Sequence, residues 1–245
     1  MVRAFFVGVK AKMRNIEGSR YILPISVGQP YHEGERFEAT IALLNRKGFQ
    51  QGRIVVASIL QRHTLGLIYK NLTEEELTKL AYEKGLEWQE RNRLLLSKLN
   101  HPIEIVDWGF FLKTDAYKIR LQEMTQLYQE DSNFREKVDV TIDGFLNRWL
   151  SRDMIKESEV ESSVISCKRY ILEECSVAST WVGQGFHYAI YPSSLAPAMA
   201  EMYAQFILPS YPNELVWVRI NLRGTTAIKN NKASRQTPKV KIGLA

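Results

Sequence analysis

The sequence predicts an α/β fold built around a parallel sheet. Apolar runs with strand-forming residues alternate with helical patterns, in the order 21–26, 33–47, 53–60, 73–99 and 103–106. Such an alternation is typical of strand–helix–strand units, in which the crossover helix connects two parallel strands. The chain has 245 residues, enough for one large core, and neither an internal repeat nor a linker divides it.

The ends of the expected helices carry recognisable signals. Gly48 is a stop signal for the first helix, and Thr73 with Glu76 fits a capping box that opens the second. Gly85 is expected to loosen that second helix, and His101-Pro102 ends it. Later in the chain we expect helices over 114–129, 131–149, 154–178 and 197–206, and strands over 186–191 and 215–222.

The net charge of +6 is unevenly distributed along the chain. Seven basic residues and no acidic residue lie from Arg219 onward, and the rest of the chain is near neutral. We expect one domain over residues 1–223, followed by a basic, flexible tail over residues 224–245. A solvated tail and a phosphate-attracting arm are both consistent with such a block of charge.

Several classes of protein are disfavoured by what the sequence lacks. Cys167 and Cys175 fall on one expected helix, where a rise of about 1.5 Å per residue separates them by about 12 Å, too far for a disulfide. The four histidines show no metal-binding spacing, and the segment 183–185 lacks the third glycine of a dinucleotide fingerprint. With no P-loop, Gly-x-Ser-x-Gly motif, signal-peptide core or membrane-spanning run, we expect a cytoplasmic protein.

Three places in the chain carry candidate chemistry. Ser26 ends the first expected strand with Gly28 close behind, at the edge of an α/β sheet where ligands bind. Tyr170 and Glu174 stand one turn apart on an expected helix, where a phenol and a carboxylate could bind an ammonium group or relay protons. The segment Tyr191-Pro192 ends a later strand. Taken singly, each is also consistent with a structural cap, a helix-surface pair or a strand terminus.

A short stretch late in the second helix is basic. Arg91, Arg93 and Lys98 lie in an acid-free segment, and positions 91 and 98 share a helix face. This face is suited to a phosphate backbone. The residues before it, 73–90, carry six Glu against two Lys, so a helix charged to suit its own dipole is the alternative.

In order and spacing, these segments resemble the tRNA-dependent cyclodipeptide synthases over about residues 20–222. The resemblance rests on Ser26 after a strand, Tyr117 in Asp-Ala-Tyr, the Tyr170-x-x-x-Glu174 pair, the late Tyr191, and the Glu-Asp-Ser-Asn-Phe-Arg segment at 130–135. Gln29, three residues after the serine, and Pro192 resemble the family's Tyr-Pro branch. Pro24 departs from the Gly-x-Ser of better-known members.

The resemblance implies a single Rossmann-like domain, a mostly parallel sheet with helices on both faces, as in the catalytic domains of class I tyrosyl- and tryptophanyl-tRNA synthetases. Their His-x-x-His or His-x-Gly-His and Lys-Met-Ser-Lys-Ser motifs are absent here. That fits an enzyme that receives amino acids already activated as esters. No ATP, metal or organic cofactor is then needed. The expected partners are two aminoacyl-tRNAs per product, without a membrane, and a monomer is favoured.

The resemblance also implies roles for the candidate residues. Ser26 would carry an aminoacyl group in a ping-pong acyl transfer. Tyr170 and Glu174 would hold the ammonium group, Tyr191 would relay protons, and Tyr117 would position the aminoacyl group. The remaining expected contacts are Gln29 and Pro192 to the substrate, and Arg91, Arg93 and Lys98 to tRNA. A non-catalytic RNA-binding Rossmann-like protein and a serine esterase are the rival hypotheses.

Overall fold

The sheet is mixed but mostly parallel, as the sequence predicts. A computed structural model describes residues 2–7 and 16–224. In these residues, one six-stranded sheet has the order β1-β6-β5-β2-β3-β4, and only the β1–β6 pair is antiparallel. The strands are β1 (Val2–Val7), β2 (Arg20–Ser26), β3 (Gln51–Ala57), β4 (Ile103–Asp107), β5 (Tyr188–Tyr191) and β6 (Val216–Gly224).

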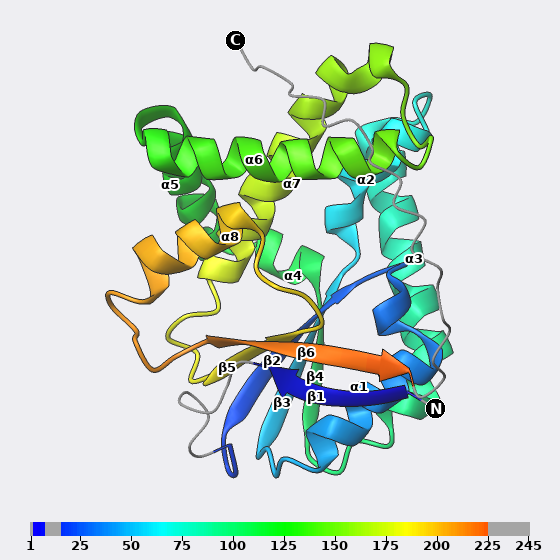
Figure 1. Cartoon of the computed structure of the whole chain (residues 1–245), viewed down its shortest axis with the longest axis vertical. Helices are drawn as coiled ribbons and strands as arrows, with labels where there is room; N and C mark the ends of the chain where they lie inside the picture. Colours follow the sequence, from blue (N-terminus) through cyan, green and yellow to red (C-terminus); the bar gives the residue numbers. More distant parts are fainter. Residues whose placement is uncertain (1, 8–15, 225–245) are drawn as a thin grey trace.

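Helices cover both faces of this sheet (Figure 1). They are α1 (Gly34–Asn45), α2 (Arg62–Ile68), α3 (Glu74–Leu96), α4 (Trp108–Leu112), α5 (Asp115–Glu130), α6 (Ser132–Leu150), α7 (Val160–Ser179) and α8 (Pro197–Met202). Alternate residues of the central strands enter two separate cores. Ile22 and Val55 pack towards α4–α8, whereas Leu23 and Ile54 pack towards α1 and α3. Burial on both faces explains why these strands are continuous apolar runs in the sequence.

Most of the expected elements are confirmed, and the capping box is among them. The Glu76 backbone N–H donates to the Thr73 hydroxyl at 3.3 Å, and the Glu76 carboxylate accepts from the Thr73 N–H at 2.8 Å. The expectation that Gly85 loosens this helix is wrong, because α3 runs through it without a break. A side chain at this position would place its Cβ 2.4 Å from the Cβ of Ser58, so the glycine allows close packing.

Two further expectations need correction. The helix expected from residue 154 begins at Val160, because α6 ends in a turn with Asp153 at a positive φ of 54° and Ile155 is buried without being helical. The helix expected to reach Phe206 leaves the α-helical form after Met202 and continues as a π-helical turn. The sequence analysis also missed β1, α2 and α4. In the described residues no helix combines the length and the apolar character that crossing a membrane requires.

The candidate site lies where the chain reverses its direction of travel across the sheet. From β2 the chain proceeds to β3 and β4 on one side, and it later returns to add β5 and β6 on the other. Such a switch point leaves a crevice at the carboxyl ends of the strands. The β2–β5 register covers only Tyr21–Tyr188 and Ile22–Ala189, so the two strands are no longer paired where Ser26 and Tyr191 end them.

Candidate functional site

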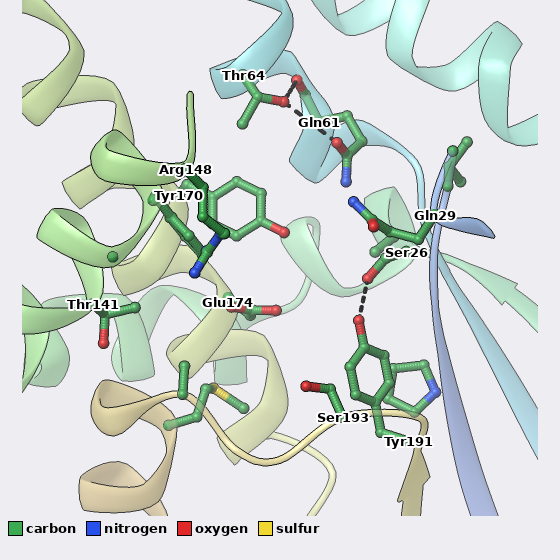
Figure 2. Close-up of a pocket in the computed structure, with 18 of the residues that line it drawn as sticks. Ser26, Gln29, Gln61, Thr64, Thr141, Arg148, Tyr170, Glu174, Tyr191 and Ser193 are labelled. Carbon is green, nitrogen blue, oxygen red and sulfur yellow. Dashed lines mark hydrogen bonds between the residues drawn. The ribbon is translucent and has the colours of Figure 1, made fainter. Parts of the chain in front are cut away.

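The structure brings four of the five expected catalytic residues to one cavity of about 1070 Å³. Ser26 and Tyr191 enter it from the ends of β2 and β5, and Tyr170 and Glu174 enter it from α7 (Figure 2). Gln29 also lines the cavity. Ser26 and Tyr191 lie far apart in the sequence, and the parallel pairing of β2 with β5 places both at the same edge of the sheet.

Three hydroxyl groups form a chain at the nucleophile candidate. The Ser26 Oγ lies 2.6 Å from the Tyr191 hydroxyl, which lies 2.9 Å from the Tyr31 hydroxyl. Burial raises the pKa of both tyrosines above the usual value, so both phenols are protonated at neutral pH. Sequence analysis missed Tyr31, and no local pattern around it indicates a contact with a residue 160 positions away.

His32 binds the backbone of Ser26 and not its hydroxyl, which is bonded to Tyr191. The Ser26 backbone N–H donates to His32 Nδ1 at 3.0 Å, and the indole N–H of Trp88 donates to the His32 carbonyl at 2.9 Å. The ring is completely buried, and burial lowers the pKa of His32 to about 3. His32 is therefore neutral and fixes the turn after β2. It does not serve as a base for the serine hydroxyl.

The pair on α7 combines a protonated phenol with a carboxyl group that is a weaker acid than usual. Burial raises the pKa of Glu174 to about 7. Burial and the charge of Glu174 together hold the pKa of Tyr170 well above its usual value. In Figure 2 the Glu174 carboxyl lies between α7 and the Ser26–Tyr191 pair. A carboxyl group that titrates near neutral pH is suited to accept a proton from an attacking amine, or to pair with an ammonium group.

Tyr117 does not line this cavity. Its side chain is buried beside Glu173, and burial together with that charge raises the pKa of Tyr117 to about 12. Glu173 accepts hydrogen bonds from Arg62, His63 and Trp108. Tyr117 therefore belongs to a buried polar cluster, and direct contact with an aminoacyl group at Ser26 is not what the structure offers.

Of the residues expected to contact the substrate or tRNA, some line the cavity and others do not. Pro192 does not line the cavity, and Ser193 and Ser194 beside it do. Arg91 lies at the cavity but is paired with Glu33 at 3.0 Å. Arg93 and Lys98 lie outside the cavity, paired with acidic residues of their own.

Two cavity residues that sequence analysis missed are Arg148 and Arg152, at the end of α6. An acid-free stretch of sequence singled out Arg91, Arg93 and Lys98. Arg148 and Arg152 lie in no such stretch, and only the folded structure shows that they line the cavity. Within the described ranges, no group of three or more His, Cys, Asp or Glu side chains could hold a metal ion. The basic residues from Lys229 onward lie outside the described residues.

Comparisons with known proteins place the chain in a family. No family model and no curated protein matches it. A solved CDPS (cyclodipeptide synthase) from Fluoribacter dumoffii is 35% identical, with a TM-score of 0.86 over 91% of this chain and 100% of that chain.

Two more distant structures show the same fold. The cyclodipeptide synthase of Candidatus Glomeribacter gigasporarum, solved bound to Phe-tRNAPhe, is 21% identical with a TM-score of 0.68, over 91% of this chain and 96% of that chain. A Mycobacterium tuberculosis protein, whose structure relates cyclodipeptide synthetases to type I tRNA synthetases, is 14% identical with a TM-score of 0.55, over 90% and 91%. Assignment to the Tyr-Pro branch stays a prediction. The sequence resemblance to the family as a whole is confirmed: the chain belongs to the cyclodipeptide synthases.

Proposed function

We propose that this chain joins two amino acids, each delivered by an aminoacyl-tRNA, into a cyclic dipeptide through an ester on Ser26. The observation that carries the proposal is the 2.6 Å contact between the Ser26 and Tyr191 hydroxyls, at the edge of a cavity that also holds Glu174. Membership of the family supports the product class. The relative solved with Phe-tRNAPhe supports an aminoacyl-tRNA as the substrate.

In the first half-reaction, Ser26 Oγ attacks the ester carbonyl of the first aminoacyl-tRNA. The bond between that carbonyl and the ribose oxygen breaks, and the serine proton passes to the ribose oxygen as the tRNA leaves. The hydrogen bond between the Tyr191 hydroxyl and Ser26 Oγ supports Tyr191 as the carrier of this proton. The ester is already activated, so the step requires neither ATP nor a strong base.

In the second half-reaction, the amine of a second aminoacyl-tRNA attacks the acyl-serine. Glu174, with its pKa near 7, accepts the proton that the amine loses, and Ser26 leaves as it takes up a proton. The dipeptide so formed is still esterified to the second tRNA. Attack by the same serine transfers it to the enzyme, and the second tRNA leaves as its ribose oxygen takes up the serine proton. The free amine of the dipeptide then attacks the remaining ester and closes the ring, and the proton that the amine loses passes to the Ser26 oxygen as it leaves. Before these steps, the Glu174–Tyr170 pair holds the ammonium group of the first amino acid.

The site favours this proposal over a serine esterase. Among the described residues that line the cavity, none is a histidine, and the nearby His32 is engaged with the serine backbone. The proposed tRNA contacts of Arg91, Arg93 and Lys98 rest on the sequence pattern. The non-catalytic RNA-binding alternative predicts no covalent intermediate, which makes the acyl-enzyme the deciding measurement.

The test is intact-protein mass spectrometry after mixing with aminoacyl-tRNA, combined with measurement of the cyclic product. Ser26→Ala is expected to abolish both the acyl-enzyme and the product, and to change stability by only about 1 kcal/mol, since one hydrogen bond is lost. The matched control is Ser193→Ala, because Ser193 lines the same cavity and its hydroxyl forms no hydrogen bond among the described residues. Cyclic dipeptide made by the Ser26 variant would rule out Ser26 as the nucleophile.

A further inference from the structure

Two arginines on one wall of the cavity have no acidic partner. Arg148 stands in the last turn of α6, and Arg152 follows shortly after its end. Arg148 lies over the Phe145 ring at 4.7 Å, but within the described part of the chain neither guanidinium group forms an ion pair or a hydrogen bond. Arg91, a third arginine that lines the cavity, differs from them because it is paired with Glu33 and Glu87.

The charge on this wall is uncompensated. Burial and the neighbouring charge of Arg152 together lower the pKa of Arg148, the direction expected when two cations share a site without a counter-ion. The described carboxylates that line the cavity are Glu87, which Arg91 pairs, and Glu174, which is partly protonated at neutral pH. An anion bound between the two arginines would therefore meet no nearby competitor.

The position of Arg148 links this wall to the reacting group. Its charge acts on the phenol of Tyr31, which is hydrogen-bonded to Tyr191, the partner of Ser26. Figure 2 shows Arg148 on the wall that faces Ser26 across the cavity, above Glu174. A substrate with its ester carbonyl at Ser26 therefore extends its leaving group along a surface within reach of Arg148.

We propose that Arg148 and Arg152 bind the phosphodiester groups nearest the acylated 3′ end of the tRNA. The proposal rests on the function proposed above. The reacting amino acid has no carboxylate, because it is esterified, and the nearest anion of the substrate is the phosphate on the same terminal nucleotide. A guanidinium group binds such a phosphate through two parallel N–H donors, which fixes position as well as charge.

The test compares two substrates with the same reacting ester, of which only one carries phosphates. One is an aminoacyl-tRNA, and the other is the same amino acid esterified to adenosine. In the double variant Arg148→Gln, Arg152→Gln, we expect Ser26 acylation by the aminoacyl-tRNA to fall at least tenfold. Acylation by the aminoacyl-adenosine should fall far less, because only the effect of the Arg148 charge on the Tyr31 phenol is lost there. Replacing both arginines by Lys should restore only part of the rate with tRNA, because an ammonium group supplies the charge but not the two parallel donors. Equal losses with the two substrates, or no loss with either, would overturn the proposal.

A binding measurement provides a readout that needs no chemistry. The affinity of deacylated tRNA should fall at least tenfold in the Gln variant, and its log–log salt dependence should flatten by about 1.4, since each single-strand phosphate contact contributes about 0.7. Unchanged affinity and slope would contradict the proposal. If the wild-type protein is acylated by neither substrate yet the affinity falls as expected, the proposed reaction fails and the anion site stands.

The matched control is Arg169→Gln on α7. Arg169 is exposed, forms no ion pair within the described residues and does not line the cavity, so its loss removes one of the same kind of charge, half of what the double variant removes, from a different surface. Its effect on tRNA affinity should be small. A loss as large as that of the double variant would mean that net charge, and not this wall, determines binding.

Discussion

Two neighbouring carboxylates on α7 have opposite surroundings. Glu173 is buried among donors: Arg62 binds it through two guanidinium nitrogens, and the side chains of His63 and Trp108 add hydrogen bonds at 3.2 and 3.0 Å. Glu174, the next residue, lines the cavity, and no residue in the described part of the chain forms an ion pair or hydrogen bond with its carboxyl group.

The two pKa shifts show the consequence of this difference. Burial raises the pKa of both groups. At Glu173 the hydrogen bonds from His63 and Arg62 outweigh burial and hold the pKa below its usual value, whereas at Glu174 burial acts alone and raises the pKa to about 7. One carboxylate is therefore permanently charged and ties α7 to α2, and its neighbour gains and loses a proton near neutral pH. The hydrogen-bond donors around Glu173, which Glu174 lacks, therefore distinguish a structural carboxylate from one suited to proton transfer.

Removing the charge of Glu173 should have the largest effect, and the effect should be on stability. Glu173→Gln leaves Arg62 with only the exposed Glu74, at 3.4 Å, as a counter-ion, which should lower the free energy of unfolding by about 3 kcal/mol. Urea denaturation followed by circular dichroism measures it. Glu159→Gln is the matched control, because its ion pair with Lys70 lies at the surface and should matter little. Equal losses in the two variants would contradict the structural role of Glu173.

Removing the charge of Glu174 should instead reduce activity. Glu174→Gln keeps the shape of the side chain but can neither accept a proton nor pair with an ammonium group, so kcat/KM should fall about 100-fold or more. Stability should stay the same or rise, because the wild-type carboxyl group has no partner that the amide would lose. Product yield at matched protein concentration is the measurement. Near-normal yield would remove Glu174 from the mechanism.

The pH profile should separate the two groups further. With a pKa of about 7, roughly a tenth of Glu174 is ionised at pH 6, so kcat/KM should fall about tenfold from its alkaline plateau to that pH. The Glu174→Gln variant should lack this limb. A wild-type profile that is flat from pH 6 to 8 would count against a proton acceptor with this pKa.

The same shift has a stability counterpart. Because the folded pKa of Glu174 lies above its ordinary value of 4.5, the folded chain binds more protons between pH 4.5 and 7, and the contribution of this group to stability falls as the pH rises through that window. The contribution of Glu173, whose pKa is lowered, is instead present above its unfolded pKa and lost in acid. Unfolding free energies of wild type and Glu174→Gln should therefore diverge in favour of the variant over this range.

The smallest expected effect is at Tyr31. Tyr31→Phe removes one hydrogen bond to Tyr191, worth about 1 kcal/mol, and should slow acylation of Ser26 roughly fivefold. Single-turnover acylation measures the step directly. Tyr69→Phe is the control, because Tyr69 is an exposed tyrosine outside the cavity. If the two variants behave alike, the outer end of the hydroxyl chain has no role in the first step.

The parts of the fold that could be predicted are those whose burial produces a recognisable apolar pattern in the sequence. β2 and β3 are buried on both faces and read as apolar runs, and α3 begins at a capping box that is visible in the sequence. The helices α2 and α4 have too few turns to show a helical period of apolar residues in the sequence. The start of α7 was misplaced because Ile155 is buried in a turn and imitates the helical spacing.

The site was predictable only in part, because the expected residues came from ordered motifs. Ser26, Tyr191 and Glu174 do meet at one cavity. Tyr117 belongs to a family motif as well, but its side chain lies beside Glu173 and outside the cavity. Nothing in the sequence of its own helix indicates that orientation. The hydrogen bond of Tyr31 and the unpaired state of Arg148 depend on residues distant in the chain, so local sequence holds no signal for either.

Pro24 keeps β2 and β5 from pairing at the edge of the cavity, which it lines. The backbone N–H of Arg20 and its C=O both face residue 187, so by the two-residue period of a strand Pro24 and Ser26 face β5 as well. Pro24 has no hydrogen to donate, and His32 takes the one at Ser26. Backbone hydrogen bonds between the ends of β2 and β5 therefore cannot form when the cavity is empty. Substrate binding then breaks no hydrogen bonds between strands, and the full binding energy is available for orienting the ester.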